Sequence, residues 1–212
     1  MKGFLLFALV SLAVSQQFPP VPSTPDGQVY GPGPNTNYTL DVFFDQLCPY
    51  SAQAFPNLYH YWINQQHWLR MVIHIVPLPY HYYSFDVSRA GRFLQGEYGQ
   101  VNFTAYLSWI FTHQDRYLQA AQSWDQPTLF QNIAADASTA TGINSTLVLN
   151  ALTNDLYETS LRLSWKYAMS KSISGTPTYM LNGVIVPAMS SFSTYQDWQD
   201  FFNSLSLSTT LG

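Results

Sequence analysis

The chain has 212 residues, enough for one domain with its own hydrophobic core. Charged residues make up only 9% of it, against about 25% in an average globular protein, while 47% are apolar and 17% aromatic, which excludes a disordered acidic or basic chain. Eight Lys and Arg against twelve Asp and Glu give a net charge of −4, which excludes a surface that coats a nucleic-acid backbone. The single cysteine excludes a disulfide within one chain.

The first 15 residues have the pattern of a secretory signal peptide. Met1 and Lys2 give a positive start, residues 4–14 are mostly apolar, and residues 13–15 are small, as signal peptidase requires. The apolar run is too short to span a bilayer. We therefore predict a signal peptide over 1–15, a mature start at Gln16, and no membrane attachment after cleavage. The destination is the extracellular space or the lumen of the secretory or endolysosomal pathway.

Three sequons agree with that route. Asn37, Asn102 and Asn144 each begin an Asn-x-Ser/Thr sequence and are the predicted glycosylation sites.

Residues 16–36 are rich in proline and glycine, so we expect a leader that is loose or laid over the surface, with the domain spanning 37–212. Residues 38–44 alternate as a mostly buried strand, and 69–76 read as a second strand. Between them, apolar residues recur at helical spacing from Pro49 to Trp62, with Pro56 inside the pattern.

A helical block follows over about 86–171, with helices expected near 87–95, 103–120, 127–137 and 144–169. Residues 178–186 then form a predicted hairpin around Asn182-Gly183, the pair that best tolerates a two-residue turn. A short amphipathic helix over 195–205 closes the chain. No internal repeat is visible.

Cys48 lies between the end of the first strand and the start of a proline-led helix. A sulfur in that place faces unpaired backbone N–H groups and the positive end of the helix dipole, and both stabilise a thiolate. This placement is typical of a nucleophilic cysteine, although a small buried hydrophobe would fit the same position.

Two segments carry a family resemblance. Residues 43–51, FFDQLCPYS, resemble the active-site strand and helix start of the DsbA-like branch of the thioredoxin superfamily. Residues 174–183, SGTPTYMLNG, resemble the segment of that branch that holds a cis-proline facing the cysteine. The resemblance implies an α/β, thioredoxin-like fold with a helical insertion between the second strand and the cis-Pro hairpin.

The resemblance also implies roles for individual residues. Cys48 would attack a disulfide, Pro49 and Tyr50 would lie beside the substrate, and the backbone of Thr176, before the cis Pro177, would pair with an incoming peptide. The expected partners are cysteine-containing peptides or proteins, or glutathione. No cofactor is predicted beyond glutathione as a co-substrate, and the oligomeric state is left open.

The sequence departs from the family at the second cysteine. Ser51 stands there, one helical turn from Cys48, and can at most donate a hydrogen bond to the sulfur. A mixed disulfide at Cys48 would persist until an outside thiol released it. Val42 replaces the acidic residue often found six positions before the cysteine, and Asp45 is a poor substitute because a nearby carboxylate opposes thiolate formation. We interpret Asp45 as a hydrogen-bonding residue of the loop.

Three functions remain open. The first is a secreted monothiol thiol–disulfide oxidoreductase or isomerase that uses Cys48, with Ser51 beside it. The second is a redox-inactive module that binds peptides or other ligands in the groove around Pro177. The third is a glutathione transferase or isomerase similar to the kappa-like relatives, against which the predicted secretion weighs.

No metal site is predicted. The histidines at positions 60, 67, 74 and 81 are evenly spaced, but the run crosses a helix, a strand and a proline loop, so they do not share a face. His81 belongs to a tyrosine-rich loop, residues 80–83, that either lines a ligand groove or packs at the edge of the core.

Overall fold

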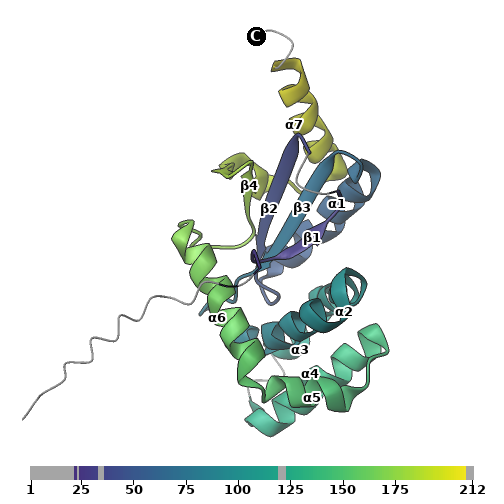
Figure 1. The fold of residues 1–212 in the computed structure, drawn as a ribbon, viewed down its shortest axis with the longest axis vertical. Helices are drawn as coiled ribbons and strands as arrows, with labels where there is room; N and C mark the ends of the chain where they lie inside the picture. Colours follow the sequence, from purple (N-terminus) through teal and green to yellow (C-terminus); the bar gives the residue numbers. More distant parts are fainter. Residues whose placement is uncertain (1–21, 23, 33–35, 119–122, 209–212) are drawn as a thin grey trace, which may run out of the picture.

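The computed structural model describes residues 22, 24–32, 36–118 and 123–208 (Figure 1). The predicted signal peptide lies outside these residues. The chain forms a mixed α/β structure whose elements, in order, are β1 (Gln28–Tyr30), β2 (Tyr38–Phe44), α1 (Pro49–Gln65), β3 (Leu69–Ile75), α2 (Ser84–Thr112), α3 (Asp115–Leu118), α4 (Gln126–Thr141), α5 (Ser145–Leu152), α6 (Asp155–Ser170), β4 (Thr178–Leu181), β5 (Val184–Ile185), the 3₁₀ turn η2 (Pro187–Ser191) and α7 (Tyr195–Ser208).

The five strands form one sheet in the order β1-β3-β2-β4-β5. The central pair, β2 and β3, is parallel, and the other pairings are antiparallel. Leu40, Val42 and Phe44 of β2 are fully buried and belong to the core cluster that also contains residues of α1 and α7. The register follows from this pattern, because a slip by one residue would turn these side chains to the opposite face.

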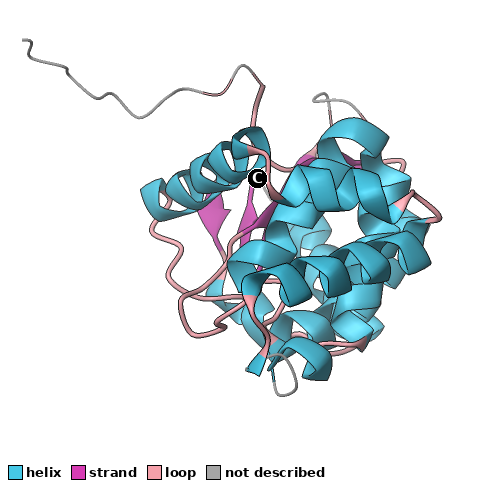
Figure 2. Cartoon of the chain, turned by 90° about the horizontal axis from the view of Figure 1, so that it is seen from below, coloured by secondary structure: helices cyan, strands magenta, loops and turns pink. Residues whose placement is uncertain are grey.

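The helices α2 to α5 form a separate block at one end of the sheet (Figure 1), and from below they lie as a layer in front of the strands (Figure 2). This block has its own buried cluster of apolar residues, built mainly from α2, α4 and α5, which Leu47 of the turn before Cys48 also joins. The insertion predicted over 86–171 corresponds to α2 to α6. Within the described part of the chain, no helix is long and apolar enough to cross a membrane.

Two helix boundaries differ from the prediction. α2 contains the two helices expected near 87–95 and 103–120, separated at Gly99, where a φ of 72° and a ψ of −167° are non-helical, but the second ends at Thr112. The helix expected over 144–169 is divided into α5 and α6. The side chain of Asn154 accepts a hydrogen bond from the backbone N–H of Leu156 and so begins a new helix.

The hairpin turn is formed as the sequence predicts. Asn182 and Gly183 connect β4 to β5 with φ values of 48° and 81°, the left-handed conformation that a two-residue turn requires. Pro56 lies inside α1, also as predicted.

The domain begins earlier than residue 37, because part of the expected leader belongs to the sheet. β1 pairs antiparallel with β3, with Tyr30 opposite Met71. Tyr30 is fully buried, its hydroxyl lies 2.7 Å from that of Thr104, and its ring contacts Trp62 edge-on at 5.4 Å between centroids. A strand of three residues between prolines and glycines is too short to produce a visible alternation, so composition alone misplaced this boundary.

Candidate active site

Cys48 caps the N-terminus of α1. Its backbone is extended, with φ −76° and ψ 119°, and Pro49 takes the first helical position, where the missing N–H costs nothing. The Cys48 N–H donates to the carbonyl of Asp45 at 3.1 Å, and its own carbonyl accepts from the N–H of Ala52 at 3.1 Å. The turn after β2 and the first turn of the helix therefore fix the direction of the sulfur.

The sulfur lies next to the second family segment. The Thr176–Pro177 peptide bond is cis, and the Cys48 Sγ donates a hydrogen bond to the carbonyl oxygen of Thr176 at 3.2 Å. The exposed fraction of Cys48 is 4%. The structure thus brings together two segments that are far apart in the sequence, with the thiol against the backbone that precedes the proline.

The residues around the thiol differ in how deeply they are buried. Pro49 and Tyr50 are exposed, Tyr50 by 70%, and Thr176 and Pro177 are half-buried. Ser51 is fully buried, and no partner within hydrogen-bond distance of its hydroxyl is found among the described residues. The predicted substrate-contacting residues therefore form the surface, and the residue in place of a second cysteine lies beneath it.

Asp45 is a fully buried hydrogen-bond acceptor for the active-site turn. One carboxylate oxygen accepts from the N–H of Leu47 at 2.8 Å and from the hydroxyl of Ser84. The other accepts from the N–H of Leu78 at 2.9 Å and bonds Nδ1 of His81 at 2.7 Å. These contacts agree with its interpretation as a loop hydrogen-bonder, and they join the turn to the loop after β3.

Gln114, just past the end of α2, holds the other side of the turn. Its side-chain amide donates to the carbonyl oxygens of Gln46 and Cys48, both at 3.0 Å. This role was not predicted, because nothing in the sequence around Gln114 distinguishes it from a surface glutamine of the helical block.

The floor of the site is largely apolar. Val42 pairs with Tyr179 across β2 and β4, and Tyr179 is fully buried. Burial, with a smaller contribution from the nearby Cys48, raises the pKa of Tyr179, so this phenol stays protonated. Tyr179 takes part in the aromatic core through edge contacts with Phe44 and Trp198.

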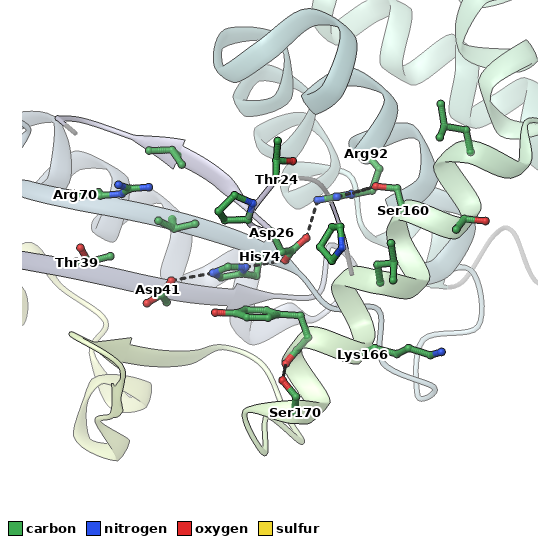
Figure 3. A pocket seen from close by; sticks show the side chains of 18 residues that line it. Thr24, Asp26, Thr39, Asp41, Arg70, His74, Arg92, Ser160, Lys166 and Ser170 are labelled. Carbon is green, nitrogen blue, oxygen red and sulfur yellow. Dashed lines mark hydrogen bonds and ion pairs between the residues drawn. The ribbon is translucent and has the colours of Figure 1, made fainter. Parts of the chain in front are cut away.

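A second polar cluster lies on the sheet away from Cys48 and was not predicted (Figure 3). His74 of β3 bonds Asp26 through Nδ1 at 2.8 Å and Asp41 through Nε2 at 3.0 Å. Asp26 also accepts from the hydroxyl of Ser164 at 2.8 Å and pairs with Arg92 at 3.1 Å. The cluster borders a cavity of about 910 Å³ between the sheet and α6.

The residues of this cluster stabilise one another's charged forms. Burial alone would lower the pKa of His74, but the hydrogen bonds and negative charges of Asp26 and Asp41 outweigh it and raise that pKa. Burial alone would raise the pKa of Asp26, but His74, Arg92 and Ser164 hold it below its usual value. The cluster fastens the segment before β1 to β3, α2 and α6. The cluster was not predicted, because Asp26 lies in the segment expected to be a loose or surface-laid leader.

The three sequons differ in surroundings. Asn37 and Asn144 are exposed, and Asn144 caps α5 by accepting from the N–H of Thr146 at 2.8 Å. Asn102 is half-buried within α2, and its side chain donates to the carbonyl of Tyr98 at 3.1 Å. Glycosylation stays a prediction, with Asn37 and Asn144 the more accessible positions.

No family model matches the sequence, and no curated protein is significantly similar to it. Solved structures do match the fold. A putative protein-disulfide isomerase from Pseudomonas syringae gives a TM-score of 0.65 at 24% identity, covering 82% of this chain and 96% of its own. DsbA from Chlamydia trachomatis gives a TM-score of 0.67 at 13% identity, and the match covers 91% of this chain and 98% of that protein. A periplasmic thioredoxin-like protein from Salmonella enterica serovar Typhimurium gives 0.55 at 18% identity, covering 76% and 80%.

The fold is therefore the DsbA-like form of the thioredoxin fold, with the helical insertion between β3 and β4, as predicted from the two sequence segments. These similarities establish the architecture around Cys48. What the site does with its thiol is a separate question, which depends on the residues themselves.

Proposed function

We propose that the protein is a secreted thiol–disulfide oxidoreductase or isomerase that acts through mixed disulfides at Cys48. The observation that carries the proposal is the position of the Cys48 sulfur, at the N-terminus of α1 and 3.2 Å from the carbonyl oxygen of Thr176, beside a cis-proline. The sulfur lies at the start of a proline-led helix, and the Thr176 backbone offers a strand-like partner to a peptide.

The reaction starts when Cys48 loses its proton to solvent and releases Thr176. The thiolate attacks one sulfur of a substrate disulfide, forms a mixed disulfide and expels the other substrate sulfur as a thiolate. In isomerisation, a second substrate thiolate attacks the substrate sulfur of the mixed disulfide. A new substrate disulfide forms, Cys48 leaves as a thiolate, and no net oxidation or reduction occurs.

Because Ser51 stands in place of a second cysteine, the site has no thiol of its own to resolve the mixed disulfide. A hydroxyl cannot attack the mixed disulfide as a second cysteine would, so a dithiol is not oxidised within this site. Glutathione is the proposed external thiol. When it attacks the Cys48 sulfur of the mixed disulfide, it releases the substrate as a thiol and leaves glutathionylated Cys48, which a second glutathione returns to the thiol as glutathione disulfide forms.

The proposed substrates are cysteine-containing peptides or proteins, and the proposed location is extracellular or in the lumen of the secretory or endolysosomal pathway. The signal-peptide pattern and the sequons support the location. One structural neighbour is described as a periplasmic thioredoxin-like protein, which agrees with this location.

Exposure to glutathione disulfide, followed by intact-mass measurement, tests the first step. We expect one glutathionyl group on the wild-type protein and on Ser51→Ala, and none on Cys48→Ser. Wild type and Ser51→Ala should also reactivate a substrate with scrambled disulfides, and Cys48→Ser should not.

A redox-inactive binding module is the second candidate, favoured by the low exposure of Cys48. It predicts a wild-type protein that forms no adduct and reactivates no substrate, yet binds cysteine-free extended peptides in a manner weakened by substitution of Tyr50. That combination of results would remove the thiol proposal.

A further inference from the structure

A cavity of about 580 Å³ lies between α6 and the loop that follows β3. Its walls are mainly apolar and aromatic, with Pro77, Pro79, Tyr82 and Phe85 facing Trp165 of α6. Tyr82 is 83% exposed and Trp165 38% exposed, so two large aromatic surfaces face solvent here in a domain that buries most of its others. The volume lies within the range of small-molecule sites.

Positive charge is concentrated on one wall of this cavity. Arg162 and Lys166 are one helical turn apart on α6 and both line it. As far as the described residues go, no carboxylate lines the cavity with them. An anionic group would therefore be attracted chiefly to Lys166, because the charge of Arg162 is partly balanced by its ion pair with Glu158.

The two cations differ in how far they are already engaged. Arg162 pairs with Glu158 at 2.6 Å and lies over the ring of Phe85, 5.1 Å from its centroid. The ammonium group of Lys166 makes no hydrogen bond or ion pair with any residue that the structure describes. In Figure 3 its side chain points away from the cluster of Asp26 and His74, although it also borders that second cavity.

The wall opposite α6 is fixed by the active-site turn. Leu78 and His81 both line the cavity, and both are hydrogen-bonded to the buried carboxylate of Asp45. The loop therefore does not need to be ordered by a ligand, which lowers the entropic cost of binding.

We propose that this cavity binds a small organic anion, with a flat apolar body against Trp165, Tyr82 and Phe85 and an acidic group at Lys166 and Arg162. Aromatic walls favour a planar body through stacking. A carboxylate, sulfonate or phosphate supplies the negative partner that the ammonium group of Lys166 lacks. Binding does not require the thiol of Cys48, so the inference is independent of the proposed redox function.

Anilinonaphthalene sulfonate is a suitable probe, because it combines a flat apolar body with one negative charge. We expect saturable binding to the full mature chain, with energy transfer from Trp165 to the probe that falls in Trp165→Phe. Lys166→Gln should raise the dissociation constant by about five- to tenfold, the size expected for a charged hydrogen bond at a partly exposed site.

Lys171→Gln is the matched control, since it removes the same charge from the exposed end of the same helix. It should leave binding unchanged, as should Cys48→Ser, which separates this site from the thiol chemistry. Uncharged anilinonaphthalene should bind at least fivefold more weakly than the sulfonate. Equal affinity of wild type and Lys166→Gln, or equal weakening by Lys171→Gln, would overturn the proposal, as would equal binding of the uncharged compound.

Discussion

The thiol of Cys48 donates to the carbonyl oxygen of Thr176 at 3.2 Å, across 128 positions of sequence. This contact places the only thiol of the chain against the Thr176–Pro177 segment, whose peptide bond is cis. A peptide that pairs with the Thr176 backbone would therefore share this carbonyl oxygen with the thiol. Chemistry at Cys48 and peptide pairing at Thr176 are thereby linked.

Restoring a second cysteine is the sharpest test of the site geometry. Ser51 is buried and one helical turn beyond Cys48, so Ser51→Cys should form a reducible bridge to Cys48 under mild oxidation. The measurement is the loss of free thiols under denaturing conditions and their return with a reductant. Gln53→Cys, at an exposed position of the same helix, is the control and should keep both thiols free within the monomer.

Asp45→Asn should destabilise the fold by about 2–3 kcal/mol, because an amide cannot accept from all four donors that surround the buried carboxylate. Urea unfolding measures this. Ser84→Ala removes only one of the donors and should cost about 1 kcal/mol. If both variants unfolded like wild type, Asp45 would not hold the active-site turn.

The histidine cluster predicts a pH dependence of stability. The pKa of His74 is raised above the usual 6.5 in the folded state, so its stabilising effect is complete below 6.5 and is lost as the pH rises through the folded value. Asp26, whose pKa is lowered, acts in the opposite direction, and its contribution is lost as the pH falls below 3.8.

Urea unfolding between pH 5 and pH 9 should therefore show wild type losing stability as the pH rises. His74→Gln should be less stable at pH 5 and should lack the part of the slope due to this residue. His67→Gln, at an exposed position, should keep the wild-type slope. Parallel pH profiles for wild type and His74→Gln would contradict the predicted role of the cluster.

Tyr30 tests whether the domain begins with β1. Tyr30→Ala should reduce the free energy of unfolding by about 3–5 kcal/mol, as expected for an aromatic residue removed from a core. Tyr30→Phe keeps the ring and loses only the contact with Thr104, at a cost of about 1 kcal/mol. Denaturant unfolding measures both changes. If β1 belonged to a loose leader instead of the core, both variants would unfold like wild type.

The sequence predicted the parts of the fold that depend on local patterns. The alternation around Val42, the proline-led helix after Cys48 and the Asn182-Gly183 turn each determine their own conformation, and the structure has a strand, a helix and a hairpin there. The two family segments then specified the architecture, which could not be obtained from local pattern alone.

The remaining parts depend on contacts between distant segments. Gln114 reaches the turn at Cys48, and Asp26 reaches His74, only because the helical block and the sheet pack as they do. A polar residue has no periodic signal that reveals its partner. The three-residue β1 was missed for a related reason, since its conformation is set by pairing with β3.

β1 also covers the outer edge of β3. Without it, Met71, Val72 and Ile73 would present the unpaired backbone of an apolar strand to solvent, a ready template for adding strands from other molecules. Many proteins guard such an edge with lysines, but this chain has only eight basic residues in total. Here the edge is covered by the short segment that Asp26 fastens to the sheet, so proteolytic trimming before residue 31 should increase aggregation.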